Sequence, residues 1–221
     1  MKTKTAILLG ATGLTGNLLL QQLLKDDDFQ KIILFSRSSV KLQHSKLEAH
    51  LIDLFQLENY KDQFHADVVF CCVGTTQKKT PDNETYRKVD FGIPVTAAKL
   101  AKQNNIPKMI VVSAIGADKN SRFFYNKTKG EMEEAILAEK ISETYILQPS
   151  LIDGSREESR PFELAWKKVM RLANFIMIGP FKKYRSIQAE TIASAIQILS
   201  KKNYPKSIID SEEIKEIVSR T

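Results

Sequence analysis

A glycine-rich turn near the start of the chain, Gly10-Ala11-Thr12-Gly13-Leu14-Thr15-Gly16, constrains the fold more than any other feature. The apolar run Thr5–Leu9 before it is typical of a short buried strand, and leucines recur after it at helical spacing as far as Lys25. In this setting such a turn binds the pyrophosphate of a dinucleotide, because glycine permits the tight turn and the helix N-terminus attracts phosphate.

The glycine spacing, GxxGxxG, differs from the GxGxxG of the usual dinucleotide fingerprint. A purely structural turn between a strand and a helix therefore stays open as an alternative. If the turn binds a cofactor, the pyrophosphate lies against its backbone and the start of the helix. The residues that we expect to contact the cofactor there are Gly10, Thr12, Gly13, Leu14 and Thr15.

The end of the second predicted strand indicates which dinucleotide is bound. This strand, Lys31–Phe35, is followed by Ser36-Arg37-Ser38-Ser39, and no acidic residue comes after it before Glu48. Sites for NAD usually place an acid about 20 residues past the glycines, whereas an arginine there accommodates the 2′-phosphate of NADP. Arg37, assisted by Ser38, therefore predicts NADPH as the cofactor, with an ordinary surface arginine as the alternative.

Four further strands are predicted at residues 47–52, 67–73, 108–112 and 144–147, with helical stretches at 86–103 and 126–140 between them. This alternation predicts an α/β fold, a Rossmann-type doubly wound parallel sheet with helices on both faces, formed as one domain by residues 1–221. Ligands bind such sheets at the carboxyl ends of the strands. We therefore expect further cofactor contacts there, with Asp53 near the adenine, from Asp53, Leu54, Gly74, Thr75, Pro149 and Leu151.

Tyr125 and Lys129 lie four residues apart, so a helix would carry a phenol and an ammonium on one face. A free phenol titrates near 10, and a neighbouring ammonium favours the phenolate, so we expect Lys129 to lower the pKa of Tyr125. Such a phenol would pass a proton to or from a substrate oxygen. An exposed Tyr–Lys pair on a solvated helix is the alternative.

The combination of these residues resembles the short-chain dehydrogenases/reductases. Their catalytic set is a serine at a strand end and Tyr-x-x-x-Lys about a dozen residues later, matched here by Ser113, Tyr125 and Lys129. The resemblance implies that Tyr125 is the proton donor, that Lys129 also holds the nicotinamide ribose, and that Ser113 hydrogen-bonds the substrate oxygen. Members of this family typically carry an asparagine where Asp90 stands here, so the family's proton relay is in question.

The resemblance narrows to the atypical branch related to mammalian Tat-interacting protein and covers roughly residues 4–200. It rests on GxxGxxG, on the compact length and on three strings: residues 70–76, 116–121 and 155–161. Members of this branch bind NADPH, and several have been proposed to regulate other proteins through direct contacts. Two functions therefore stay open: an NADPH-dependent reductase of a small carbonyl compound, and an NADPH-binding redox sensor that acts on a protein partner.

The composition excludes several other classes. The formal net charge of +7 comes from lysine pairs scattered along the chain without interleaved aromatics, which argues against nucleic-acid binding. No apolar run approaches the roughly 20 residues that span a bilayer, and the first apolar run is too short for a signal peptide. The two adjacent cysteines fit a reducing compartment, and the three histidines lack metal-ligand spacing. We therefore expect a cytoplasmic protein without a bound metal or membrane contact.

Residues 151–221 are expected to form a small C-terminal region on the substrate side of the site. An amphipathic helix at 162–172, which includes Trp166, would close over the nicotinamide or serve only as core. A further packed helix is predicted at 192–199, and the tail at 207–218 has too little pattern to assign. The substrate and the oligomeric state do not follow from the sequence.

Overall fold

The computed structural model of the chain describes residues 3–153 and 185–220. Seven strands form one sheet in the order β3-β2-β1-β4-β5-β6-β9, and every neighbouring pair is parallel. The order reverses between β1 and β4, which places the binding crevice of such a sheet at the carboxyl ends of these two strands. The strands are β1 (Lys4–Leu9), β2 (Phe29–Ser36), β3 (Leu47–Leu51), β4 (Val68–Cys71), β5 (Lys108–Val112), β6 (Glu143–Gln148) and β9 (Ile208–Asp210).

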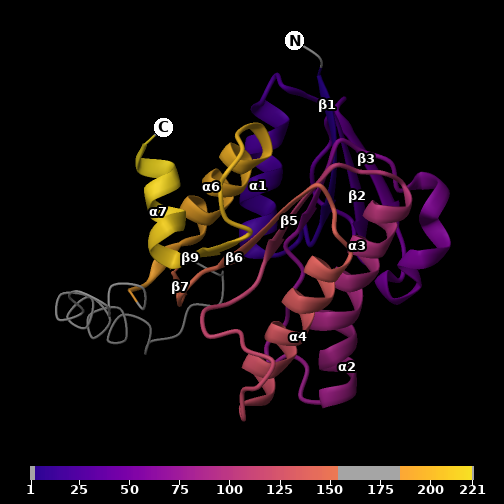
Figure 1. Cartoon of the computed structure of the whole chain (residues 1–221). Helices are drawn as coiled ribbons and strands as arrows, with labels where there is room; N and C mark the ends of the chain where they lie inside the picture. The colour runs from indigo at the N-terminus through magenta and orange to yellow at the C-terminus, as the bar shows by residue number, and fades with distance from the viewer. Residues whose placement is uncertain (1–2, 154–184, 221) are drawn as a thin grey trace, which may run out of the picture.

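Helices cover both faces of the sheet, with α1, α6 and α7 on one side and α2, α3 and α4 on the other (Figure 1). A separate two-stranded pairing joins β7 (Ile152–Asp153) to β8 (Ile187–Gln188). The helical elements are α1 (Leu14–Lys25), η1 (Leu54–Gln63), α2 (Asn83–Arg87), η2 (Lys88–Gly92), α3 (Ile93–Gln103), α4 (Phe124–Ala138), α6 (Ala189–Lys201) and α7 (Ser211–Ser219).

The inner strand β1 shows why the sheet is buried on both faces. Ile7 and Leu9 belong to the core under η1, α3 and α4, whereas Ala6 and Leu8 belong to the core under α1, α6 and α7. All four side chains are fully buried. Because successive strand residues point to opposite faces, an uninterrupted apolar run is what a doubly covered strand requires. The predicted Rossmann-type fold is thereby confirmed.

Two regions differ from the sequence prediction. The stretch expected to be one helix over 86–103 contains a π-helical turn, η2, between α2 and α3, which places Asp90 in the interior. The tail at 207–218, which had no assignment, forms the edge strand β9 and the helix α7. Asp210 starts α7 with a capping box, in which Asp210 and Glu213 satisfy each other's backbone N–H groups.

The described helices and edge strand of the C-terminal region pack into the core, while Leu151, Ile152 and Glu190 line the cavity at the carboxyl ends of the strands. α6 packs against α1, and β9 extends the main sheet next to β6. The expectation that residues 151–221 mainly build the substrate side is wrong for these described elements. The helix predicted at 162–172, with Trp166, and the string at 155–161 lie outside the described residues.

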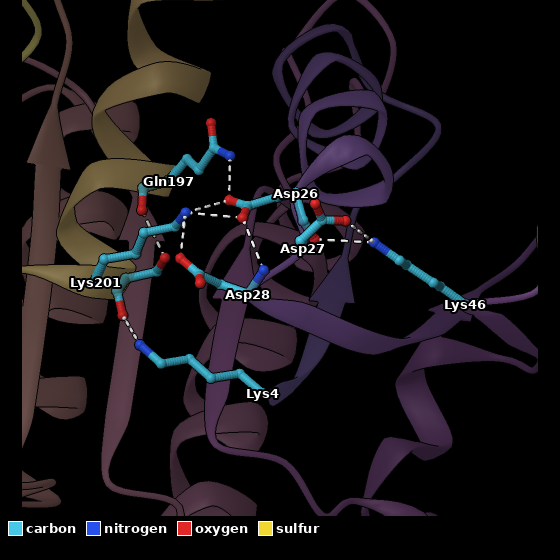
Figure 2. A network of polar contacts seen from close by, with 8 residues as sticks. Lys4, Asp26, Asp27, Asp28, Lys46, Gln197 and Lys201 are labelled. Carbon is cyan, nitrogen blue, oxygen red and sulfur yellow. Dashed lines mark hydrogen bonds and ion pairs between the residues drawn. The ribbon is translucent and has the colours of Figure 1, made fainter. Parts of the chain in front are cut away.

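A polar network ties α1 to α6 at the end of the sheet opposite the crevice (Figure 2). Lys201 on α6 lies 2.6 Å from carboxylate oxygens of both Asp26 and Asp28, and the Gln197 amide donates to Asp26. Burial raises the pKa of Asp26, but the hydrogen bonds from Lys201 and Gln197 outweigh this effect, so the net pKa is below its usual value. The network fastens the α1–β2 turn to the C-terminal end of α6.

Candidate active site

The glycine turn after β1 forms a close backbone cradle. Gly10 has φ +87°, in the left-handed region, and a Cβ there would lie 2.6 Å from the carbonyl of Cys72 after β4. A Cβ at Gly16 would lie only 2.1 Å from the Gly10 carbonyl oxygen. Both positions therefore require glycine, because the start of α1 passes directly over the end of β1. Any side chain at these two positions would clash with backbone atoms.

The N-terminus of α1 is left open for an anion. Gly13 is its N-cap and carries no side chain that could accept from the first-turn N–H groups, and the first turn contains no acidic residue. Free N–H groups and the positive end of the helix dipole therefore point to the carboxyl ends of β1 and β4. A pyrophosphate fits this cradle, which meets the requirement of the predicted cofactor.

A cavity of about 1410 Å³ opens in front of this turn. It brings together the predicted site residues from the carboxyl ends of six strands, β1 to β6, and the helices that follow them. Those lining it are Gly10, Thr12, Gly13, Leu14, Thr15, Arg37, Ser38, Leu54, Gly74, Thr75, Ser113, Tyr125, Lys129, Pro149 and Leu151. Asp53 is the exception: it lines a second cavity of about 390 Å³, with Arg37, Leu51 and Ile52.

The end of β2 presents a positive charge next to hydroxyl groups. Ser36 is buried, and its hydroxyl donates to the Ser38 carbonyl at 2.8 Å, which fixes the turn that carries Arg37. In the described part of the chain no carboxylate pairs with Arg37. The Asp53 carboxylate instead caps η1, where it accepts from the Phe55 N–H at 3.0 Å. Arg37 is therefore free to hold a phosphate at the mouth of the cavity.

Lys129 and Asp90 form a buried ion pair at the centre of the site. The Lys129 ammonium lies 2.8 Å from Asp90 Oδ1, and the two side chains are 4% and 1% exposed. The other oxygen, Asp90 Oδ2, accepts from the Thr75 N–H at 2.8 Å. The carboxylate that stands where the family usually has asparagine thus fixes the lysine and the loop after β4. A π-turn at η2 brings it there, a feature common at functional sites.

Tyr125 lies in the first turn of α4, and its ring packs edge-to-face against the buried Tyr86. Partial burial and the negative charge of Asp90 raise the pKa of Tyr125 to about 12. The expectation that Lys129 lowers this pKa is therefore wrong for the cofactor-free chain. The physical reasons are, first, that burial of the phenol disfavours its charged form and, second, that Asp90, which the prediction left out, pairs with the ammonium and opposes another negative charge nearby.

Ser113 follows β5 and has a partner that sequence reasoning missed. Its hydroxyl donates to the carboxylate of Glu133 on α4, and the Gln148 amide at the end of β6 donates to the same carboxylate at 3.0 and 2.8 Å. Glu133 is 5% exposed. Burial raises its pKa, and the hydrogen bonds from Ser113 and Gln148 and the charge of Lys129 offset only part of this rise, so the net pKa is above its usual value. The sequence did contain a signal for this partner: Glu133 lies one helical turn after Lys129 and between the apolar residues Met132 and Ile136, where an acid is unusual.

Other expectations concern groups that are not at the site. Cys71 is buried, and burial raises the pKa of its thiol to about 11, so it is no nucleophile. Across residues 3–153 and 185–220, no cluster of metal-ligating side chains occurs. Within the same described residues, no helix combines the length and apolar character that a membrane span requires.

Comparison with known proteins identifies the family. Residues 10–155 match the model of the NAD(P)H-binding family. The chain is 35% identical over 195 residues to Protein FMP52, mitochondrial, of Meyerozyma guilliermondii, covering 86% of this chain and 83% of that protein. It is 32% identical over 172 residues to Protein HTATIP2 of Rattus norvegicus, covering 76% and 71%.

A solved structure agrees on the fold. The Bordetella bronchiseptica enzyme WbmG, crystallised with NAD, superposes with a TM-score of 0.71 over 99% of this chain and 78% of that chain, at 11% identity. The expected cytoplasmic location is contradicted, because the fungal relatives are named as mitochondrial proteins. The chain belongs to the NAD(P)H-binding family and, within it, to the atypical short-chain dehydrogenases/reductases related to HTATIP2 and FMP52.

Proposed function

We propose that this protein is an NADPH-dependent oxidoreductase that reduces a small carbonyl substrate, with Tyr125 as the proton donor. The observation that carries the proposal is the shared cavity, because the glycine turn, Arg37 and the set of Ser113, Tyr125 and Lys129 all line it. These residues come from segments far apart in the sequence. Their convergence at the carboxyl ends of the strands matches the site of a dinucleotide-dependent reductase.

The cofactor would lie across the β1–β4 crevice. The cradle formed by Gly10, Gly13 and Gly16 suits its pyrophosphate, and Arg37 with Ser38 suits a 2′-phosphate. Lys129 would hold the nicotinamide ribose, with Asp90 fixing the position of the ammonium. When bound, the reduced cofactor supplies the hydride.

Tyr125 would supply the proton that completes the reduction. With a pKa of about 12, its phenol carries its proton at neutral pH and is ready to give it to an alkoxide, which is a much stronger base. The same raised pKa disfavours the phenolate that the reverse reaction, alcohol oxidation, requires. This supports carbonyl reduction as the proposed direction.

A panel of aldehydes, ketones and quinones tests this proposal through the oxidation of NADPH. We expect turnover with at least one carbonyl, and we expect Tyr125→Phe to lower kcat by about 10²- to 10⁴-fold while NADPH affinity is unchanged. Tyr204→Phe, which removes a phenol that is not among the residues lining the cavity, is the matched control. If Tyr125→Phe retained full turnover, the assigned proton donor would be wrong.

A second candidate is an NADPH-binding redox sensor that acts on a protein partner with little catalysis. The pairing of Lys129 with Asp90 favours it, because a neutralised ammonium does not activate Tyr125. Tight NADPH binding without oxidation across the whole panel would support this candidate. NADPH-dependent capture of a defined partner would then be the measurement that establishes it.

A further inference from the structure

The buried carboxylate of Glu133 controls which way the Ser113 hydroxyl faces. Ser113 Oγ donates to Glu133, and both residues are nearly inaccessible to solvent, at 6% and 5% exposure. The Gln148 amide also donates to this carboxylate, to Oε1, which it shares with Ser113, and to Oε2. Three elements, β5, α4 and β6, therefore meet at this group.

Burying the Glu133 carboxylate costs free energy, and packing of the core does not require a charged group at this position. Glu133 lies between Met132 and Ile136 on the buried face of α4, where an apolar side chain would suit the core. Lys129, one turn earlier, is engaged by Asp90. Among the described residues, the hydrogen bonds to the Glu133 carboxylate come from Ser113 and Gln148.

The hydrogen bond to Glu133 limits what the Ser113 hydroxyl can offer to a substrate. A serine hydroxyl has one proton to donate and two lone pairs that accept. With its proton on Glu133, Ser113 offers only lone pairs to the cavity that it lines. It therefore accepts a hydrogen bond there, which is the opposite of the donation to a substrate oxygen that the sequence resemblance implied.

We propose that Glu133 is a positioning residue that holds Ser113 as a hydrogen-bond acceptor, and that the matching substrate carries a hydroxyl beside its reacting carbonyl. This inference rests on the proposed reductase function and names its substrate class, the α-hydroxy carbonyl compounds. The hydroxyl of such a substrate donates to Ser113 while Tyr125 serves the carbonyl oxygen. A simple ketone leaves the Ser113 lone pairs without a donor in a buried site.

A matched pair of ketones tests the proposal: an α-hydroxyketone and the same ketone without the hydroxyl. We expect the wild-type kcat/KM to favour the hydroxyketone by about 10- to 100-fold. Glu133→Ala frees the Ser113 hydroxyl to rotate, so this preference falls to near unity. Ser113→Ala also loses the preference.

Two variants separate positioning from a loss of structure. Glu133→Gln retains an oxygen that accepts from Ser113, so it keeps most of the preference. Glu134→Gln, whose parent carboxylate pairs with Lys119 at the surface of the same helix, leaves both rates unchanged. A urea-denaturation cycle with Ser113→Ala, Glu133→Ala and the double variant is expected to be non-additive, which tests the hydrogen bond without any turnover.

The outcomes distinguish this inference from the proposed function. Equal kcat/KM values for the two ketones in the wild type, or a preference that survives Glu133→Ala, would overturn the positioning role and the substrate class. An additive stability cycle would show that the Ser113–Glu133 bond is absent. If no carbonyl in the wider panel oxidises NADPH, the proposed function fails, and this inference fails with it.

Discussion

Replacing Lys129 by methionine removes the positive half of a buried ion pair and leaves the Asp90 carboxylate without a counter-charge. The Asp90 side chain is 1% exposed, so its carboxylate loses its charged partner in a nearly solvent-free position and keeps the hydrogen bond from the Thr75 N–H. Breaking a buried pair in this way costs about 3–5 kcal/mol. For a chain of this size that corresponds to a fall in the melting temperature of about 6–20 °C.

Urea and thermal denaturation of the cofactor-free protein at neutral pH measure this loss. Lys119→Met is the matched control, because Lys119 pairs with Glu134 through side chains that are 51% and 59% exposed, and such a surface pair contributes little. The Asp90→Asn/Lys129→Met double variant removes both charges and is expected to recover most of the lost stability.

Two results would refute the reasoning. Lys129→Met with the stability of Lys119→Met would mean that the Asp90 carboxylate is not held as a buried charge. A double variant no more stable than Lys129→Met would mean that the loss comes from packing of the lysine stem rather than from the unpaired carboxylate.

Three further predictions follow from other parts of the structure. With the Tyr125 pKa at about 12, the phenolate fraction, and with it the rate of alcohol oxidation, rises about tenfold per pH unit in mildly alkaline solution, while the rate of carbonyl reduction stays level. Initial rates in both directions test this, and an oxidation rate that does not change with pH would contradict it. Gly16→Ala places a Cβ 2.1 Å from the Gly10 carbonyl oxygen and so displaces the glycine turn. Fluorescence titration is expected to show that NADPH binding is lost, and a wild-type affinity would mean that this turn does not bind the cofactor. Asp26 has a lowered pKa in the folded state, so it contributes stability that is present above about pH 4 and is lost as the pH falls. The urea midpoints of Lys201→Met are expected to depend less on pH across this range than those of the wild type. An unchanged dependence would count against the network in Figure 2.

The sheet and the glycine turn could be predicted because their signals are local. Ala6–Leu9 before Gly10 are apolar at every position, as a strand segment covered on both faces must be, and the spacing of Gly10, Gly13 and Gly16 reflects a close backbone contact. The three-residue strand β9 has no such signal. Its pairing with β6 depends on a contact some 60 residues away in the sequence, between Ile146 and Ile208.

The electrostatics of the site could not be predicted, because they depend on which charges meet in three dimensions. Lys129 and Tyr125 share a helix, so their relation was visible, but Asp90 reaches them from η2 through a π-helical turn that the apolar pattern of 86–103 does not reveal. The contact of Ser113 with Glu133 likewise joins β5 to α4. Both contacts change the chemistry expected from the residue types alone.

A fluorescence titration with NADPH and NADH tests the central claim most directly, namely that the cavity in front of the glycine turn holds a 2′-phosphorylated dinucleotide. NADPH is expected to bind more tightly than NADH, and Arg37→Ala is expected to weaken NADPH by about 10- to 100-fold while NADH changes little. Equal affinity of the wild type for both dinucleotides, with no effect of Arg37→Ala, would contradict the assignment of NADPH. No binding of either dinucleotide would contradict the site itself.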